Sequence, residues 1–188
     1  MLTTDSPEHA ERARKLRWLG ISKSTHEREI GGYAWDYSID EIGYKYHMND
    51  ITAAIGLVQL AKMPEMQAKR RDIAARYCAN LRDLADDGLL RIPEYSNMVS
   101  WHLYVVRTPR RNDLSRYLRE RLISTGVHYR PLHLYKCYGY QSQRLPVAER
   151  VWPTLLTLPL YPDLSMKEVD IICEHIKDFF KTHNQEGS

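Results

Sequence analysis

The 188-residue sequence predicts a small α/β domain with a partly antiparallel sheet, preceded by long helices. Three observations support this fold class. From about residue 100 the pattern runs strand, helix, strand, strand, helix, which is typical of a layered α/β domain. Residues 64–86 carry apolar side chains at spacings of three, four and seven, as in one long amphipathic helix. The composition, 43% hydrophobic and 27% charged, is ordinary for a globular protein of this length.

The first predicted element is a helix over residues 6–20. Ser6 is a suitable N-cap, Pro7 takes the first helical position and Gly20 ends the helix. The expected inward positions are Ala10, Ala13, Leu16 and the stem of Arg17. Residues 21–42 show no clear periodicity, so we expect a loop with at most one short strand. Loops of this length in compact domains tend either to be functional or to be wrongly assigned as loops.

A second helix is expected from residue 49, with Asn49 or Asp50 as its cap. Its apolar stripe consists of Ile51, Ile55 and Val58. Pro64 is expected to interrupt this helix and to open the next one, because proline lacks the backbone N–H of a helix interior. Residues 86–88, Asp-Asp-Gly, should end that next helix.

The remaining elements form the predicted small domain. Residues 100–108 read as a strand with one face made of Trp101, Leu103 and Val105. A helix over 112–125, a short strand over 127–129, an aromatic loop over 131–145 and a helix over 146–152 follow. Residues 155–161 predict an edge strand interrupted by Pro159. Ser165 should cap a last helix whose inward positions are Val169, Ile172, Ile176 and Phe179.

Charge and cysteine content narrow the class of protein. The net charge is only +3, and the basic run of residues 69–71 lies within a helical pattern. A solvated helix face explains that run better than a nucleic-acid interface. Cys78, Cys137 and Cys173 are odd in number and lack metal-type spacing, which favours a reducing compartment. With no signal peptide and no long apolar run, we expect a cytoplasmic protein that contacts neither membrane nor nucleic acid.

Two short segments concentrate polar and aromatic side chains. They are GYKYHMND, residues 43–50, and HYRPLH, residues 128–133. The sequence contains no glycine-rich phosphate loop, no metal-ligand cluster and no nucleophile elbow. Structural explanations stay open for both segments. Tyrosines before a helix commonly wedge its start, and two histidines in an aromatic loop are often surface or hydrogen-bonded residues.

In their order along the chain, five blocks resemble one family. The blocks are GYKYHMNDITAAIGLVQLAKM, KRRDIAARYCANL, SWHLYVV, GVHYRPLHLYKCY and LPVAERVWPTLLTLPLYPDLS. They resemble the C-terminal half of the DegT/StrS nucleotide-sugar aminotransferases, which depend on pyridoxal 5'-phosphate (PLP). The resemblance implies the C-terminal portion of a fold-type I PLP aminotransferase. It divides the chain into a remnant of the large domain (1–47), linking helices (48–86) and a small C-terminal domain (87–188).

The resemblance also implies roles for individual residues. Lys45 would contact the PLP phosphate across a dimer interface, an effective charge-assisted contact. His133 and His128 would lie near the nucleotide-sugar substrate, while the role of His47 is left open. The Schiff-base lysine of the family lies before the stretch that this chain matches. We therefore expect no catalytic residue here, no covalently held PLP and no activity of the chain alone.

The family reaction transfers an amino group, usually from glutamate, to a keto-sugar nucleotide for polysaccharide or glycoside biosynthesis. The chain would then be a homodimer, or would pair with a missing N-terminal half. A second interpretation is a non-catalytic binding or assembly module that uses an exposed apolar face at Met48, Ile51 and Ile55. Nucleic-acid binding through residues 69–71 is a weaker third.

Overall fold

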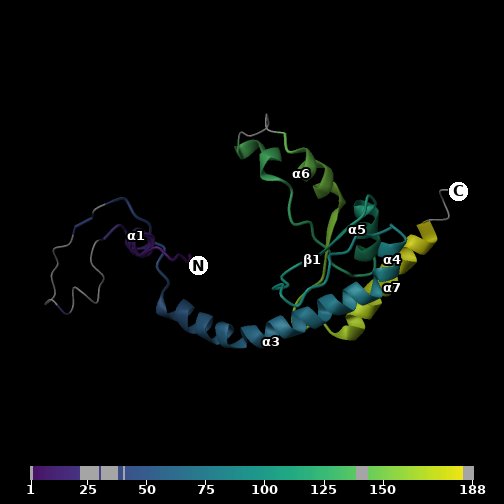
Figure 1. Ribbon diagram of the computed structural model, residues 1–188, viewed down its shortest axis with the longest axis horizontal. Coiled ribbons are helices and arrows are strands. Elements are labelled where there is room, and N and C mark those ends of the chain that lie inside the picture. The colour runs from purple at the N-terminus through teal and green to yellow at the C-terminus, as the bar shows by residue number, and fades with distance from the viewer. Residues whose placement is uncertain (1, 22–29, 31–37, 40, 139–143, 184–188) are drawn as a thin grey trace. The chain divides into compact units, whose positions relative to one another are not determined.

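A computed structural model of the chain describes residues 2–21, 30, 38–39, 41–138 and 144–183. Figure 1 shows a mixed α/β structure, which confirms the predicted fold class. Within the described residues the elements are α1 (Pro7–Arg17), α3 (Asp50–Asn80), α4 (Arg82–Asp86), β1 (Tyr104–Arg107), α5 (Arg111–Arg119), η1 (Leu132–Leu134), η2 (Lys136–Tyr138), α6 (Pro146–Val151), η3 (Trp152–Thr154), β2 (Leu155–Leu158) and α7 (Met166–His183). Most of the loop predicted over 21–42 lies outside the described residues.

The chain divides into two compact units, residues 1–61 and 62–188, with the boundary inside α3. The first unit holds α1, the segment of residues 43–49 and the start of α3. The second holds the sheet and the remaining helices. The predicted three-part division of the chain remains a prediction.

Three predicted helix caps are present because each depends only on neighbouring residues. Ser6 Oγ accepts from the backbone N–H of His9 at 3.3 Å, and Asn49 Oδ1 accepts from that of Thr52 at 2.9 Å. At α7, Ser165 Oγ accepts from the Glu168 N–H at 3.3 Å, while the Glu168 carboxylate accepts from the Ser165 N–H at 2.8 Å. This reciprocal pair is a capping box.

The predicted break at Pro64 is wrong. Helix α3 runs without interruption from Asp50 to Asn80 with Pro64 inside it. A proline removes one backbone hydrogen bond from a helix. The helical residues before and after Pro64 form enough other hydrogen bonds for α3 to continue through it. The helix predicted over residues 64–86 is divided near its end. Helix α3 ends at Asn80, and a separate short helix, α4, follows it.

The sheet of the second unit has two antiparallel strands. β1 pairs with β2 in the register Tyr104 to Leu158 and Arg107 to Leu155. Tyr104 and Val106 are buried, whereas Val105 and Arg107 are half-buried, so Tyr104 and Val106 form the core face of β1 and Val105 lies on its other face. Trp101 is buried from a position before the strand, where its Nε1–H donates to the Ser96 carbonyl.

Two further predictions change in extent. The strand predicted over 127–129 is absent, because pairing there is limited to one bridge between Gly126 and Thr157. The helix predicted over 112–125 ends at Arg119. Leu122, soon afterwards, has a left-handed φ of 61°, which does not continue a helix.

The core of the second unit lies between this sheet, the second half of α3 and helices α5 and α7. The predicted inward residues of α7 are all buried, namely Val169, Ile172, Ile176 and Phe179. Helix α7 runs alongside the end of α3 (Figure 1), and Arg76 of α3 binds Asp170 of α7 through two hydrogen bonds of 2.7 and 2.9 Å. From the sheet, the segment with η1, η2 and α6 projects away from these helices (Figure 1). We call the described residues of this segment, 129–138 and 144–154, the arm.

Candidate functional site

The GYKYHMND segment is an extended strand-like stretch held against the end of α1. The Tyr44 N–H donates to the Leu16 carbonyl at 2.6 Å and the Tyr46 N–H donates to the Arg17 carbonyl at 2.9 Å. The Leu19 N–H donates back to the Tyr44 carbonyl at 3.0 Å. These bonds place Lys45 directly opposite Trp18, with which it forms an isolated antiparallel bridge.

Two glycines make this close pairing possible. A Cβ on Gly43 would collide with the backbone of Gly20, and a Cβ on Gly20 would collide with that of Glu41. Gly20 also has a left-handed φ of 75°, which side chains other than glycine rarely adopt. The Gly20 that ends the predicted helix therefore also allows the Lys45 segment to approach.

Lys45 lies over the indole of Trp18. Its Nζ is 4.1 Å from the centre of the Trp18 ring, and no carboxylate of the described residues lies within ion-pair distance of it. The side chain is exposed. A cation held against an aromatic face and open to solvent is suited to an oxyanion such as a phosphate.

His47 contacts the same indole. Its ring meets that of Trp18 edge-on, with 4.1 Å between ring centres. His47 Nδ1 and Trp18 Nε1 are buried and have no hydrogen-bond partner among the described residues. Trp18 therefore organises Lys45 and His47 into one cluster. The sequence analysis missed Trp18, since it stands at a helix end, outside the apolar stripe that draws attention to a residue.

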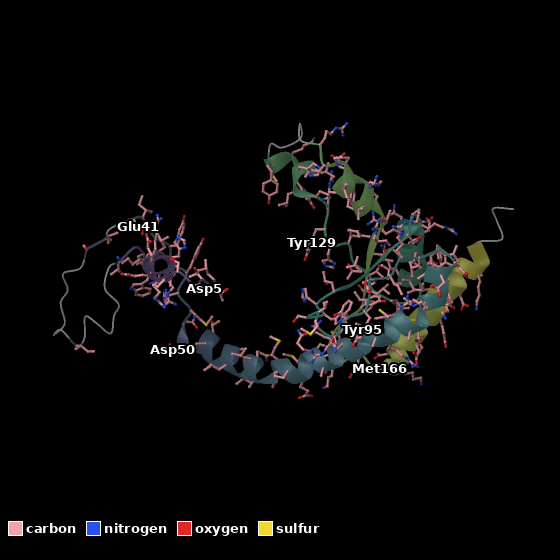
Figure 2. All side chains as sticks on the ribbon, viewed as in Figure 1. Asp5, Glu41, Asp50, Tyr95, Tyr129 and Met166 are labelled. Carbon is pink, nitrogen blue, oxygen red and sulfur yellow. The ribbon has the colours of Figure 1, made fainter. Side chains whose placement is uncertain are left out.

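In the second unit, His128 is held by its neighbours on the sheet. His128 Nδ1 is 2.8 Å from Thr157 Oγ1, and a Cβ on Gly126 would lie 2.7 Å from His128 Cε1. The His128 ring therefore lies over the backbone of Gly126, where only glycine leaves room. Tyr129, labelled in Figure 2, meets the His128 ring edge-on and is itself exposed at the base of the arm.

His133 has a different environment inside the arm. Its side chain is only 4% exposed, and its Nε2 is 3.2 Å from Glu149 Oε1 in α6. Glu149 also accepts from the Leu145 N–H at 2.9 Å. That backbone hydrogen bond, followed by the one with His133, holds the pKa of Glu149 below its ordinary value. The structure thus separates the two predicted histidines: His128 lies on the sheet, whereas His133 links the two sides of the arm.

The face of the sheet opposite the core carries arginines that the sequence analysis did not select. Arg91 pairs with Arg107 through two backbone hydrogen bonds of 2.8 Å. Arg107 Nε is buried without an acceptor among the described residues. Side chains alternate along the Tyr-Val-Val-Arg strand. Because Tyr104 and Val106 face the core, this alternation could have predicted from the sequence that Arg107 faces outward.

A charged cavity beside α7 does not form a ligand site. It encloses about 310 Å³ and is lined by Arg76, Asn80, Asp170, Cys173, Glu174 and Lys177. Three of its charged side chains pair within the protein, because Arg76 and Asn80 bind Asp170 and Lys177 Nζ lies 2.8 Å from Asp83. Burial raises the pKa of the Cys173 thiol to about 12, which leaves it protonated and unreactive at neutral pH.

Other site types receive no support from the described part of the chain. It holds no cluster of three or more histidine, cysteine or carboxylate side chains able to bind a metal ion. None of its helices is long and apolar enough to cross a membrane. Several lysines are engaged in surface ion pairs, for example Lys69 with Glu65 at 2.9 Å, which raises the pKa of Lys69.

Comparisons with known proteins identify the family of the chain. Residues 1–177 match the DegT/DnrJ/EryC1/StrS aminotransferase family. The spore coat polysaccharide biosynthesis protein SpsC of Bacillus subtilis is 34% identical over 193 residues, which cover 96% of this chain and 49% of SpsC. The chain therefore spans about half the length of this relative.

Solved structures give the same result. The aminotransferase TlmJ of Streptoalloteichus hindustanus is 33% identical, with a TM-score of 0.81 over 95% of this chain and 46% of TlmJ. The putative sugar aminotransferase Spr1654 of Streptococcus pneumoniae, in its PMP form, is 29% identical with the same TM-score and the same two coverages. The expected aminotransferase fold is thereby confirmed. The chain belongs to the DegT/DnrJ/EryC1/StrS aminotransferase family.

Proposed function

We propose that this chain is part of a PLP-dependent nucleotide-sugar aminotransferase. The reaction would move an amino group from glutamate to a keto-sugar nucleotide, in polysaccharide or glycoside biosynthesis. The observation that carries the proposal is the family match over residues 1–177, together with relatives named as sugar aminotransferases and as a polysaccharide biosynthesis protein. We place the activity in the cytoplasm, as the free cysteines suggest.

Lys45 is the proposed contact to the PLP phosphate. Its exposed ammonium group has no carboxylate partner in the described residues and is steadied by the Trp18 ring. These features fit a dianionic phosphate, which a lysine binds as a point charge. When bound, PLP supplies the electron sink of amino transfer. The part of this chain is to bind and orient the phosphate, in a homodimer or with the other half of a longer protein.

His128 is the stronger of the two proposed substrate contacts. Its Nδ1 is occupied by Thr157, so its Nε2 is the nitrogen left to meet a ligand. His133 remains a proposed contact only through a rearrangement, because its Nε2 binds Glu149. Its proposed role is therefore to fix the shape of the arm near the substrate.

A first experiment tests whether this chain holds PLP covalently. The chain is mixed with PLP, and its visible spectrum is recorded before and after treatment with borohydride. We expect no imine band that reduction fixes to a single peptide. Such a band, mapped to one lysine, would contradict the proposal that the catalytic lysine lies outside this chain.

A second experiment tests Lys45 in a chimaera in which this chain replaces the matching stretch of SpsC. Lys45→Met should weaken PLP binding about tenfold, since a charge-assisted hydrogen bond contributes roughly 1.5–3 kcal/mol. Lys62→Met, in α3, is the matched control and should leave the affinity unchanged. Equal affinities of the Lys45 variant and the control would remove Lys45 from the phosphate site.

The alternative function is a non-catalytic assembly module. It is favoured by the exposed apolar side chains of Met48, Ile51 and Ile55. Under this alternative, sedimentation of the pure chain shows a single defined species, either a monomer or a complex. Titrations of this species with PLP and with a nucleotide sugar then show no binding. Binding of either ligand in the chimaera, with loss in the Lys45 variant, favours the aminotransferase instead.

A further inference from the structure

Two arginines lie side by side on the face of the sheet opposite the core. Arg91 and Arg107 are directly opposite each other in an antiparallel bridge, with both backbone hydrogen bonds at 2.8 Å. Residues opposite each other in such a pair project their side chains from the same face. The core face is formed by Tyr104 and Val106, so both arginines project from the other face.

Within the described residues, no carboxylate neutralises the two positive charges. Within the described part of the chain, no carboxylate lies within 4.0 Å of either guanidinium group. Arg107 Nε is buried without an acceptor there, and Arg91 is exposed. Like charges placed opposite each other destabilise a sheet, and a buried donor without an acceptor adds to the cost. An anion on this face would remove both costs.

The same face carries His128. Val105 is opposite Thr157 in the β1–β2 register, and Arg107 is opposite Leu155, two residues before Thr157. Thr157 Oγ1 binds His128 Nδ1 at 2.8 Å, which explains why Thr157 is buried although it does not face the core. His128 therefore contacts β2 one row from Arg107 on the neighbouring β1, and Arg91 lies on the other side of β1.

We propose that Arg107 and Arg91 form an oxyanion subsite that binds the phosphate groups of a nucleotide sugar, beside His128. This inference rests on the proposed function, which supplies a ligand with two adjacent phosphates. Guanidinium groups match phosphate oxygens through paired N–H donors, and the Arg107 Nε–H is one such donor without a partner. His128 would then meet the sugar next to the phosphates.

Calorimetric titration of the full chain with inorganic pyrophosphate, uridine diphosphate and uridine tests the subsite. We expect both phosphate compounds to bind, more weakly as salt is raised, and uridine alone not to bind detectably. Arg107→Gln should weaken pyrophosphate at least about tenfold, because it removes a charged donor. Arg91→Gln should weaken it less, and Arg107→Lys should fall between the parent and Arg107→Gln because it keeps the charge and loses the paired donors.

Arg119→Gln is the matched control, since Arg119 is an exposed arginine of α5 away from this face. No pyrophosphate binding, or equal weakening by the control, would overturn the subsite and favour an acidic protein side chain as the partner of these arginines. If Arg107→Gln fails to fold, Arg91→Gln and Arg107→Lys decide the outcome. The titration requires neither PLP nor turnover. If the chain binds pyrophosphate through these arginines but the chimaera transfers no amino group, the proposed function is contradicted and the phosphate subsite is retained.

Discussion

The two halves of helix α3 differ in what covers their apolar side chains. After the boundary between the two units, Ile73, Ala74, Tyr77 and Cys78 are buried in a core shared with β1, β2, α5 and α7. Before it, Ile51 and Ile55 are 76% and 60% exposed, and Leu57, Val58 and Leu60 are exposed as well. One continuous helix thus contains a structural half and a half whose apolar side chains resemble an interface.

This difference indicates which residues maintain the fold and which serve contacts beyond it. The second unit has its own core and carries His128, the arginine pair and the arm. The first unit presents Lys45 from a segment that depends on backbone pairing with the end of α1, with few buried apolar contacts. Substitutions in the core should therefore act on stability, whereas substitutions at Lys45, at the arginine pair or on the exposed half of α3 should act on ligand binding or association.

The largest expected effect comes from a matched pair of substitutions in α3. Ile73→Ala should lower the free energy of unfolding by about 2–5 kcal/mol, since it empties a fully buried position. Ile55→Ala, the same change on the exposed half, should cost less than about 0.5 kcal/mol. Urea unfolding followed by far-UV circular dichroism measures both. Equal losses would contradict the distinction between the two halves of the helix.

A smaller effect is expected from Gly126→Ala. The new Cβ would press on the His128 ring, and overpacking of this kind costs about 1–3 kcal/mol. The chemical shifts of the His128 ring should change as the ring moves away from Thr157. Gly88→Ala is a useful comparison, because nothing lies near its Cβ although its φ is left-handed. An unchanged His128 spectrum in Gly126→Ala would show that the ring is not held as described.

The cap of α7 should contribute about 1 kcal/mol, the usual value for a serine N-cap. Ser165→Ala removes both side-chain hydrogen bonds that Ser165 makes with Glu168. Ser165→Asp keeps an acceptor at the cap and should retain most of the stability. Thermal unfolding of the two variants decides this prediction, which fails if alanine and aspartate unfold at the same temperature.

The smallest effect concerns the pH dependence of the Arg76–Asp170 contact. Hydrogen bonds from Arg76 and then Asn80 lower the pKa of Asp170 in the folded state. A carboxylate with a lowered pKa stabilises the fold above its unfolded pKa of about 3.9, and this contribution is lost as the pH falls through the folded value. Asp170→Asn should therefore reduce stability at pH 7 and make the acid-induced loss shallower. If the stability of the variant falls with pH as steeply as that of the parent, Asp170 does not contribute to the acid-induced loss of stability.

Local signals in the sequence predicted the features that neighbouring residues determine. The caps at Ser6, Asn49 and Ser165 and the buried stripe of α7 depend on residues within a few turns of each other. The prediction of a break at Pro64 was wrong because it considered only the turn that contains the proline. The remaining hydrogen bonds of the 31-residue helix α3 maintain it through Pro64.

The candidate site was harder to predict because it depends on distant pairing. Lys45 and His128 were selected through the family resemblance, but Trp18 lies 27 positions before Lys45 in the chain, and only the folded pairing brings the two together. The pair of Arg91 and Arg107 depends on strand register in the same way, because a shift of one residue would place the two side chains on opposite faces.

The measurement that tests the account most directly is amino transfer by the chimaera of this chain with SpsC. The chimaera is incubated with glutamate and a keto-sugar nucleotide, and the product is analysed by mass spectrometry. We predict that an aminated sugar nucleotide forms only when PLP is present. Lys45→Met should reduce its formation at limiting PLP, and Lys62→Met should not. A folded chimaera that binds PLP but aminates no sugar nucleotide would contradict the proposed function.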